Sequence, residues 1–90
     1  MVTSTNNDDR DACSYDPACS DYAITVGAYS WSHTRSSFSN YGECIDAWGP
    51  GTTIKSSRFA YGEYITADGT SSASPFMAGM IGQLLQFNPD

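Results

Sequence analysis

The chain is short of basic residues, and its charge is strongly one-sided. It has 4 Lys and Arg against 10 Asp and Glu, which gives a formal net charge of −6. This acidic balance argues against nucleic acid and anionic membranes as partners, because both attract positively charged surfaces. The same balance is compatible with a bound cation such as calcium.

Long apolar runs are also missing. No run approaches the roughly 20 residues that span a bilayer. The first residues, Met-Val-Thr-Ser-Thr-Asn-Asn-Asp-Asp, lack the basic start and the apolar stretch of a secretory signal. The sequence therefore predicts no membrane partner, and nothing within it directs export.

Cysteine is sparse and lacks the spacing of a metal site. The three cysteines are Cys13, Cys19 and Cys44, an odd number with no CxxC motif, which disfavours zinc. One disulfide plus one free thiol is the simplest account.

What is present suits one small globular domain with a thin core, since 40% of the 90 residues are hydrophobic. Residues 22–28 are rich in β-branched side chains and predict a buried strand of an α/β sheet. We expect a second strand at 44–48, ended by the Gly-Pro-Gly that follows, and a third at 52–57. Residues 1–21 and 58–62 read as irregular connections, and 63–67 as an extended segment.

The longest helical pattern follows a turn of small residues, with Pro75 expected in the first helical turn. Ser71 lies at or just before that turn, where unpaired N–H groups and the helix dipole stabilise negative charge. On these grounds alone Ser71 reads as a helix N-cap, with a nucleophile as the alternative. Apolar side chains of the helix fall on one stripe, formed by Ala73, Phe76, Met77, Met80, Ile81, Leu84 and Leu85.

The stretch Gly69-Thr-Ser-Ser-Ala-Ser-Pro-Phe-Met-Ala-Gly79 resembles the nucleophile motif of subtilisin-like serine proteases. Residues 11–18, 23–28, 35–42 and 45–51 are similar, in order and spacing, to blocks of the proteinase K branch. The resemblance covers nearly all of residues 1–90, but only the C-terminal portion of that family's catalytic domain. It implies a partial three-layer α/β fold with a mostly parallel sheet and a long helix after the nucleophile.

The resemblance implies a serine endopeptidase, in which serine attacks the peptide carbonyl, histidine takes its proton, and aspartate orients the histidine. Ser71 matches the nucleophile. Asn7 matches the asparagine that donates to the oxyanion, although Asn6 stands where the family has glycine, and both could be ordinary loop residues. His33 matches no family histidine and reads as a solvated loop residue, while Asp68 reads as a turn residue or as a negative charge at the N-terminal end of the helix dipole.

The triad aspartate and histidine are therefore expected outside these 90 residues. The isolated chain is expected to be inactive, with the missing N-terminal part of the catalytic domain as its partner and a polypeptide as substrate. The chemistry itself needs no cofactor.

Two further sites are implied by the resemblance. Gly27 and Ala28 correspond to small residues that shape the substrate pocket, the alternative being ordinary strand-end geometry. The Asp46 carboxylate, with the backbone carbonyls of Asp21 and Ala23, corresponds to a structural calcium site. Asp46 could equally be a solvated carboxylate.

Cys13 and Cys44 stand where some relatives have a disulfide. Such a bond would stabilise the fold by about 3 to 4 kcal/mol and implies an oxidising, extracellular location. Cys19 would then be unpaired.

Two positions depart from the family near the nucleophile, Ser72 in place of methionine and Phe76 in place of histidine. They motivate a second hypothesis, a non-catalytic fragment that binds a peptide or a partner. A small secreted binding domain is a third.

Overall fold

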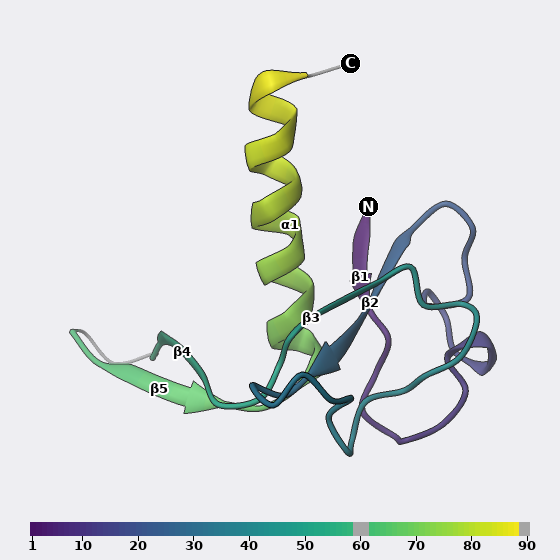
Figure 1. Ribbon diagram of the computed structural model, residues 1–90, viewed down its shortest axis with the longest axis horizontal. Coiled ribbons are helices and arrows are strands. Elements are labelled where there is room, and N and C mark those ends of the chain that lie inside the picture. Colours follow the sequence, from purple (N-terminus) through teal and green to yellow (C-terminus); the bar gives the residue numbers. More distant parts are fainter. Residues whose placement is uncertain (59–61, 89–90) are drawn as a thin grey trace.

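The computed structural model describes residues 1–58 and 62–88 of the chain. A three-stranded parallel sheet in the order β1-β2-β3 forms its centre (Figure 1). The strands are β1 (Val2–Ser4), β2 (Ile24–Tyr29) and β3 (Ala47–Pro50). The middle strand is buried from Thr25 to Ala28, which confirms the predicted buried strand and the parallel sheet.

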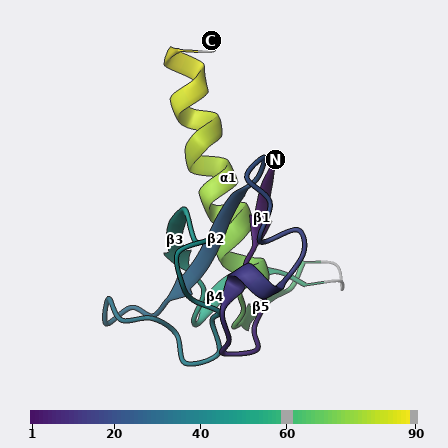
Figure 2. The same cartoon turned by 90° about the vertical axis from the view of Figure 1, so that its right-hand side faces the viewer.

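Helix α1 (Thr70–Phe87) packs its N-terminal turns on one face of this sheet (Figures 1 and 2). Val26 and Ala28 point to that face, as alternate residues of a strand do, and form the core with Ala73. All three are fully buried. The core is therefore small and lies under the first turns of the helix.

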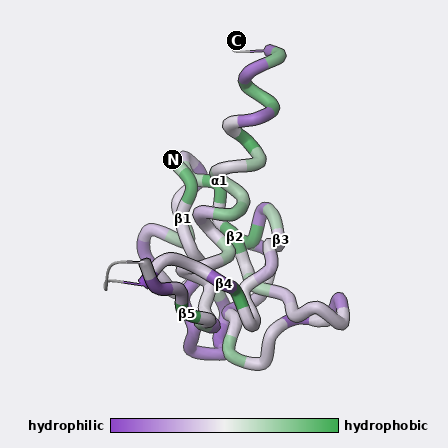
Figure 3. The backbone as a smooth tube through the Cα atoms, turned by 90° about the vertical axis from the view of Figure 1, so that its left-hand side faces the viewer, coloured by the Kyte–Doolittle hydropathy of each residue, from purple (hydrophilic) through white to green (hydrophobic). Residues whose placement is uncertain are grey.

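The rest of the predicted helix stripe is not buried within the described residues. Met77 and Ile81 are half-buried, whereas Leu84 is 68% exposed and Phe87 is 86% exposed. Figure 3 shows that hydrophobic segments continue to the far end of α1, beyond the sheet. The helix nevertheless does not meet the requirements for crossing a bilayer, and neither does any other helix among the described residues.

Strands β4 (Ile54–Ser57) and β5 (Tyr64–Ala67) form a separate antiparallel hairpin that projects to one side of the sheet (Figure 1). The predicted third strand thus belongs to a hairpin and not to the parallel sheet, and the extended segment 63–67 is its partner. The predicted loop at 58–62 lies partly outside the described residues.

The boundaries of other predicted elements were wrong. Residues 1–21 contain β1 and the short 3₁₀ helix η1 (Ala12–Ser14), because pairing with β2 makes a strand of three residues that have no alternating pattern. Strand β3 runs on through Gly49 and Pro50. Proline is tolerated there because, among residues 1–58 and 62–88, β3 pairs only with β2, so its other edge needs no N–H donor. Pro75 lies inside α1, one turn later than expected.

The predicted disulfide is confirmed. Cys13 in η1 and Cys44 ahead of β3 are joined with a Cα–Cα distance of 5.4 Å. Cys19 is a free, exposed thiol. The bond ties the long connection after β1 to the segment that leads into β3.

Candidate active site

The first turn of α1 lies at the carboxyl edge of the parallel sheet. Gly69, the N-cap, donates its N–H to the carbonyl of Gly51 just after β3, at 2.8 Å. An added Cβ at Gly51 would lie 2.8 Å from the Gly69 carbonyl oxygen and 2.5 Å from the Ala28 Cβ, so this close approach requires glycine. Open parallel sheets bind ligands at this edge.

Ser71 is exposed at this edge, as the second residue of α1. Glycine holds the N-cap position, so the N-cap residue has no side chain with which to cap the helix. The interpretation of Ser71 as the N-cap is therefore wrong. Its hydroxyl is left facing solvent at the positive end of the helix dipole.

Asn7 reaches the same turn from the loop after β1. Its Oδ1 accepts two hydrogen bonds from Thr70, one from the backbone N–H and one from the hydroxyl, both 2.8 Å. A Cβ built on Gly69 would lie 3.1 Å from Ser71 Oγ and 3.7 Å from Asn7 Nδ2. The structure thus brings the Asn7 amide nitrogen and the Ser71 hydroxyl close to the same point beside Gly69.

Two donors remain open beside the Ser71 hydroxyl. Among the described residues, neither the Asn7 amide nitrogen nor the Ser71 N–H donates a hydrogen bond. Because Thr70 occupies the amide oxygen of Asn7, the NH₂ group is the part of that side chain left to bind a ligand. A nucleophile flanked by two unpaired donors is the arrangement that acyl transfer requires.

His33 lies elsewhere, in the turn that follows β2. It is exposed, has φ 65, and stacks on Tyr29 with ring centroids 6.2 Å apart. A pocket of about 300 Å³ is lined by Tyr29, His33, Arg35 and Trp48, and Ser71 is not among its lining residues. The prediction of a loop histidine is confirmed.

The carboxylate of Asp68 is engaged in a hydrogen bond within the fold. Its Oδ1 accepts the N–H of Thr53 at 2.6 Å, which joins the two ends of the hairpin region. The bond spans 15 positions and so is not part of a turn at Asp68, whose expected turn or helix-dipole role stays a prediction.

Gly27 and Ala28 are buried on opposite faces of β2. The space above Gly27 is filled by the Trp48 ring, which lies 2.5 Å from where a Cβ would be. Ala28 packs under α1 in the core. Neither residue faces an open cleft in the part of the chain that the structure describes, and their substrate-binding role stays a prediction.

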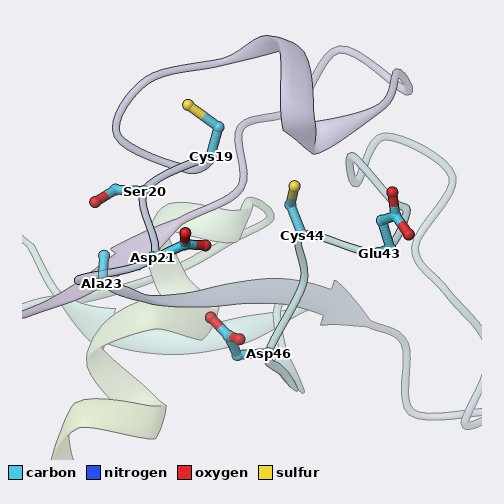
Figure 4. Close-up of a pocket in the computed structure, with 7 residues that line it drawn as sticks. All are labelled: Cys19, Ser20, Asp21, Ala23, Glu43, Cys44 and Asp46. Atoms are coloured by element: carbon cyan, nitrogen blue, oxygen red, sulfur yellow. The ribbon is translucent and has the colours of Figure 1, made fainter.

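The three proposed calcium ligands line one pocket of about 330 Å³ (Figure 4). Asp46 Oδ2 accepts the N–H of Thr25 at 2.8 Å, so one carboxylate oxygen is engaged and the other is left for a cation. The described residues contain no cluster of three or more His, Cys, Asp or Glu side chains suited to a metal ion. Backbone carbonyls would therefore have to complete the site, as they commonly do for calcium.

Cys19 lines the same pocket (Figure 4). A hydrogen bond from its thiol to Asp16 Oδ1, at 2.7 Å, together with nearby negative charge, raises the pKa of the Cys19 thiol. A raised pKa keeps the sulfur protonated and a poor nucleophile at neutral pH.

Two residues that shape the site were missed by the sequence patterns. Thr70 stands in the turn of small residues before the helix and Asn40 in the 35–42 stretch, and neither is given a role by its motif. Each could have been noticed as a polar residue next to a motif, but no sequence signal indicates its hydrogen-bond partners.

The family model described as Subtilase family matches residues 1–90, the entire chain. The chain belongs to the subtilase family. Curated relatives of this subtilase chain include Subtilisin-like protease 2 of Trichophyton verrucosum and of Trichophyton rubrum, each 47% identical over 85 residues. These matches cover 93% of the chain but 20% of each relative, so the chain spans about a fifth of their length.

Solved structures of proteases resemble the fold of this chain. A cold-adapted subtilisin-like serine proteinase superposes with a TM-score of 0.90 at 44% identity, over 94% of this chain and 31% of that one. The prenylagaramide maturation protease PagA gives a TM-score of 0.86 at 28% identity, over 96% and 32%. The predicted subtilisin-like α/β fold is confirmed.

Proposed function

We propose that this chain supplies the nucleophile and the oxyanion donors of a subtilisin-like serine endopeptidase, as the C-terminal part of a longer catalytic domain. The observation that carries the proposal is the open Asn7 amide beside Ser71 at the N-terminus of α1. Subtilisin-like proteases among the relatives support it.

In this mechanism Ser71 Oγ attacks the carbonyl carbon of a peptide bond. The carbonyl oxygen becomes negatively charged, and the Asn7 NH₂ and the Ser71 N–H stabilise it. The leaving amine takes the proton that a general base removed from Ser71, and water then hydrolyses the acyl-enzyme.

The base comes from outside these residues. A serine hydroxyl is a weak nucleophile unless a base is within hydrogen-bond reach. The only histidine of the sequence, His33, is stacked on Tyr29 in a different pocket. We therefore assign the histidine and the orienting aspartate to the remainder of the catalytic domain.

Fluorophosphonate labelling tests this division of the site. The isolated 90-residue chain is expected to remain unlabelled, because Ser71 has no base, whereas the complete catalytic domain is labelled at Ser71. Mass spectrometry of the labelled peptide identifies the residue. Stoichiometric labelling of the isolated chain would refute the assignment of the base.

A folded complete domain that binds peptide but resists labelling would favour the non-catalytic alternative. The two departures from the family, at Ser72 and Phe76, motivate that alternative. Ser72 is half-buried and Phe76 is 47% exposed on the first turns of α1.

We further propose a structural calcium ion at Asp46 and the carbonyls of Asp21 and Ala23. The free oxygen of Asp46, the shared pocket and the net charge of −6 support it. The ion would link the start of β2 to the start of β3, and would take no part in the chemistry.

Calcium is expected to raise the thermal unfolding midpoint of the complete domain, and a chelator to lower it. A ligand at 100 times its Kd stabilises the folded state by about 2.7 kcal/mol. The response disappears in Asp46→Asn and persists in Glu43→Gln, which removes a charge from the same pocket. An equal calcium response in Asp46→Asn would count against this site.

We also propose that the protein acts in an oxidising, extracellular compartment; the disulfide between Cys13 and Cys44 supports this, because such bonds persist where thiols are not kept reduced. A polypeptide is the proposed substrate, while the acidic balance disfavours nucleic acid and membrane surfaces.

A further inference from the structure

The side chain of Asn40 is fully buried and makes three hydrogen bonds, all to backbone atoms of one loop. Its Oδ1 accepts the N–H of Asp8 at 3.0 Å and the N–H of Arg10 at 2.9 Å. Its Nδ2 donates to the carbonyl of Thr5 at 2.7 Å. When the oxygen and the nitrogen of a buried side-chain amide both bond the backbone of one segment, they restrict the path of that segment.

The residues bonded by Asn40 lie on both sides of Asn7 in the sequence. Thr5 stands two residues before it and Asp8 one residue after it, and the N–H of Asn40 also donates to the carbonyl of Asn6 at 3.1 Å. Asn6 has φ 76, a left-handed backbone conformation that few residues other than glycine adopt readily. The Asn40 side chain therefore supplies three of the bonds that hold the loop around Asn7 in this uncommon shape, beside backbone bonds such as that from the N–H of Asp9 to the carbonyl of Phe38.

Asn7 itself is fixed from the opposite side. Thr70 holds its amide oxygen through two hydrogen bonds, so the orientation of the NH₂ group depends on where the backbone of Asn7 lies relative to α1. The hydrogen bonds of Asn40 constrain the position of that backbone. Catalytic donors must be held within about 0.5 Å of their productive position.

We propose that Asn40 is a positioning residue for the oxyanion donor, acting through the backbone on both sides of Asn7. The inference rests on the proposed endopeptidase function. The hydrogen bonds of the Asn40 side chain go to Thr5, Asp8 and Arg10 and not to Ser71, so its effect on the reaction passes through Asn7.

A double-mutant cycle in the complete catalytic domain tests this. Asn40→Ala is expected to lower kcat about tenfold with KM unchanged, since misplacement of a donor weakens transition-state binding only. In the Asn7→Ala background the same change lowers kcat by less than about twofold, because residues acting through one group are not additive. Rates are expressed per active site titrated with fluorophosphonate, which removes any unfolded fraction.

Ser39→Ala is the matched control. Ser39 is equally buried, and its hydroxyl bonds the N–H of Ala28 and the carbonyl of Asn40, without touching the loop around Asn7. We expect a lower unfolding midpoint with kcat within about twofold of the parent. If Asn40→Ala yields no titratable sites, Asn40→Asp replaces it in the cycle, since it keeps the volume and both acceptor bonds and loses the donor to Thr5.

Equal losses of kcat in the parent and in the Asn7→Ala background would overturn the inference, as would a loss in Ser39→Ala as large as that in the Asn40 variant. The proposed function fails separately: a Ser71→Ala domain that still hydrolyses peptide disproves the nucleophile. An inactive Ser71→Ala domain with additive Asn40 and Asn7 effects disproves only the positioning role.

Discussion

Ser71→Ala in the complete catalytic domain is expected to abolish peptide hydrolysis, lowering kcat by about 10⁶-fold, the loss known when the nucleophile of subtilisin is removed. The reason is that the acyl-enzyme needs an oxygen at this position, and alanine leaves none. The fold should survive, because Ser71 is exposed and its hydroxyl makes no hydrogen bond among the described residues. Initial rates on a peptide ester, with circular dichroism as the folding control, measure the effect.

Ser72→Ala and Ser74→Ala serve as matched controls, since both residues lie in the same turns of α1 and both are half-buried. Each is expected to keep kcat within about threefold of the parent, as for changes that leave the reacting groups in place. If either control loses as much activity as Ser71→Ala, the nucleophile has been assigned to the wrong serine.

The parts of the fold that are local in sequence could be predicted from it. The buried strand β2 and the helix α1 follow from β-branched runs and helical spacing over consecutive residues. Strand β1 could not be predicted, because Val2–Ser4 has no pattern of its own and becomes a strand by pairing with Ile24 to Val26. The extended segments that become β4 and β5 are predicted, but their pairing as a hairpin is not, since strand pairing is a tertiary choice.

The sequence predicts that the apolar side chains of α1 share one stripe, but it does not predict how much of that stripe is buried. Periodicity indicates which side chains share a face, while burial depends on what packs there. In the described part of the chain the sheet covers only the first turns of α1, so Ala73 is buried and Leu84 is 68% exposed.

The candidate site residues Ser71 and Asn7 could be named from the sequence, but the hydrogen bonds that arrange them could not. Ser71 and Asn7 were identified from motifs, which are read along the chain. The bonds that arrange them join residues far apart in sequence, since Asn7 and Thr70 are separated by 63 positions and Thr5 and Asn40 by 35. No local pattern records such a pairing.

Asn7→Ala is expected to lower kcat by about 10²- to 10³-fold with little change in KM, the magnitude found when subtilisin loses its oxyanion asparagine. The amide meets the carbonyl oxygen closely only when that oxygen becomes tetrahedral and charged, so its loss affects the transition state more than substrate binding. Asn7→Ala also strips Thr70 of its acceptor, and Thr70 is 1% exposed. A lower unfolding midpoint should therefore accompany the loss of activity.

Asn7→Asp separates these two effects. Aspartate keeps an oxygen for both Thr70 donors but replaces the NH₂ group with a negatively charged oxygen that repels the oxyanion. The unfolding midpoint of Asn7→Asp should therefore lie closer to that of the parent than to that of Asn7→Ala. Its kcat should stay at or below the Asn7→Ala value. Asn6→Gly, which accepts the left-handed backbone without strain, is the neighbouring control and should leave kcat unchanged. A kcat for Asn7→Asp near that of the parent would show that the donor at Asn7 carries no catalytic role, whatever the bonds to Thr70 contribute to the fold.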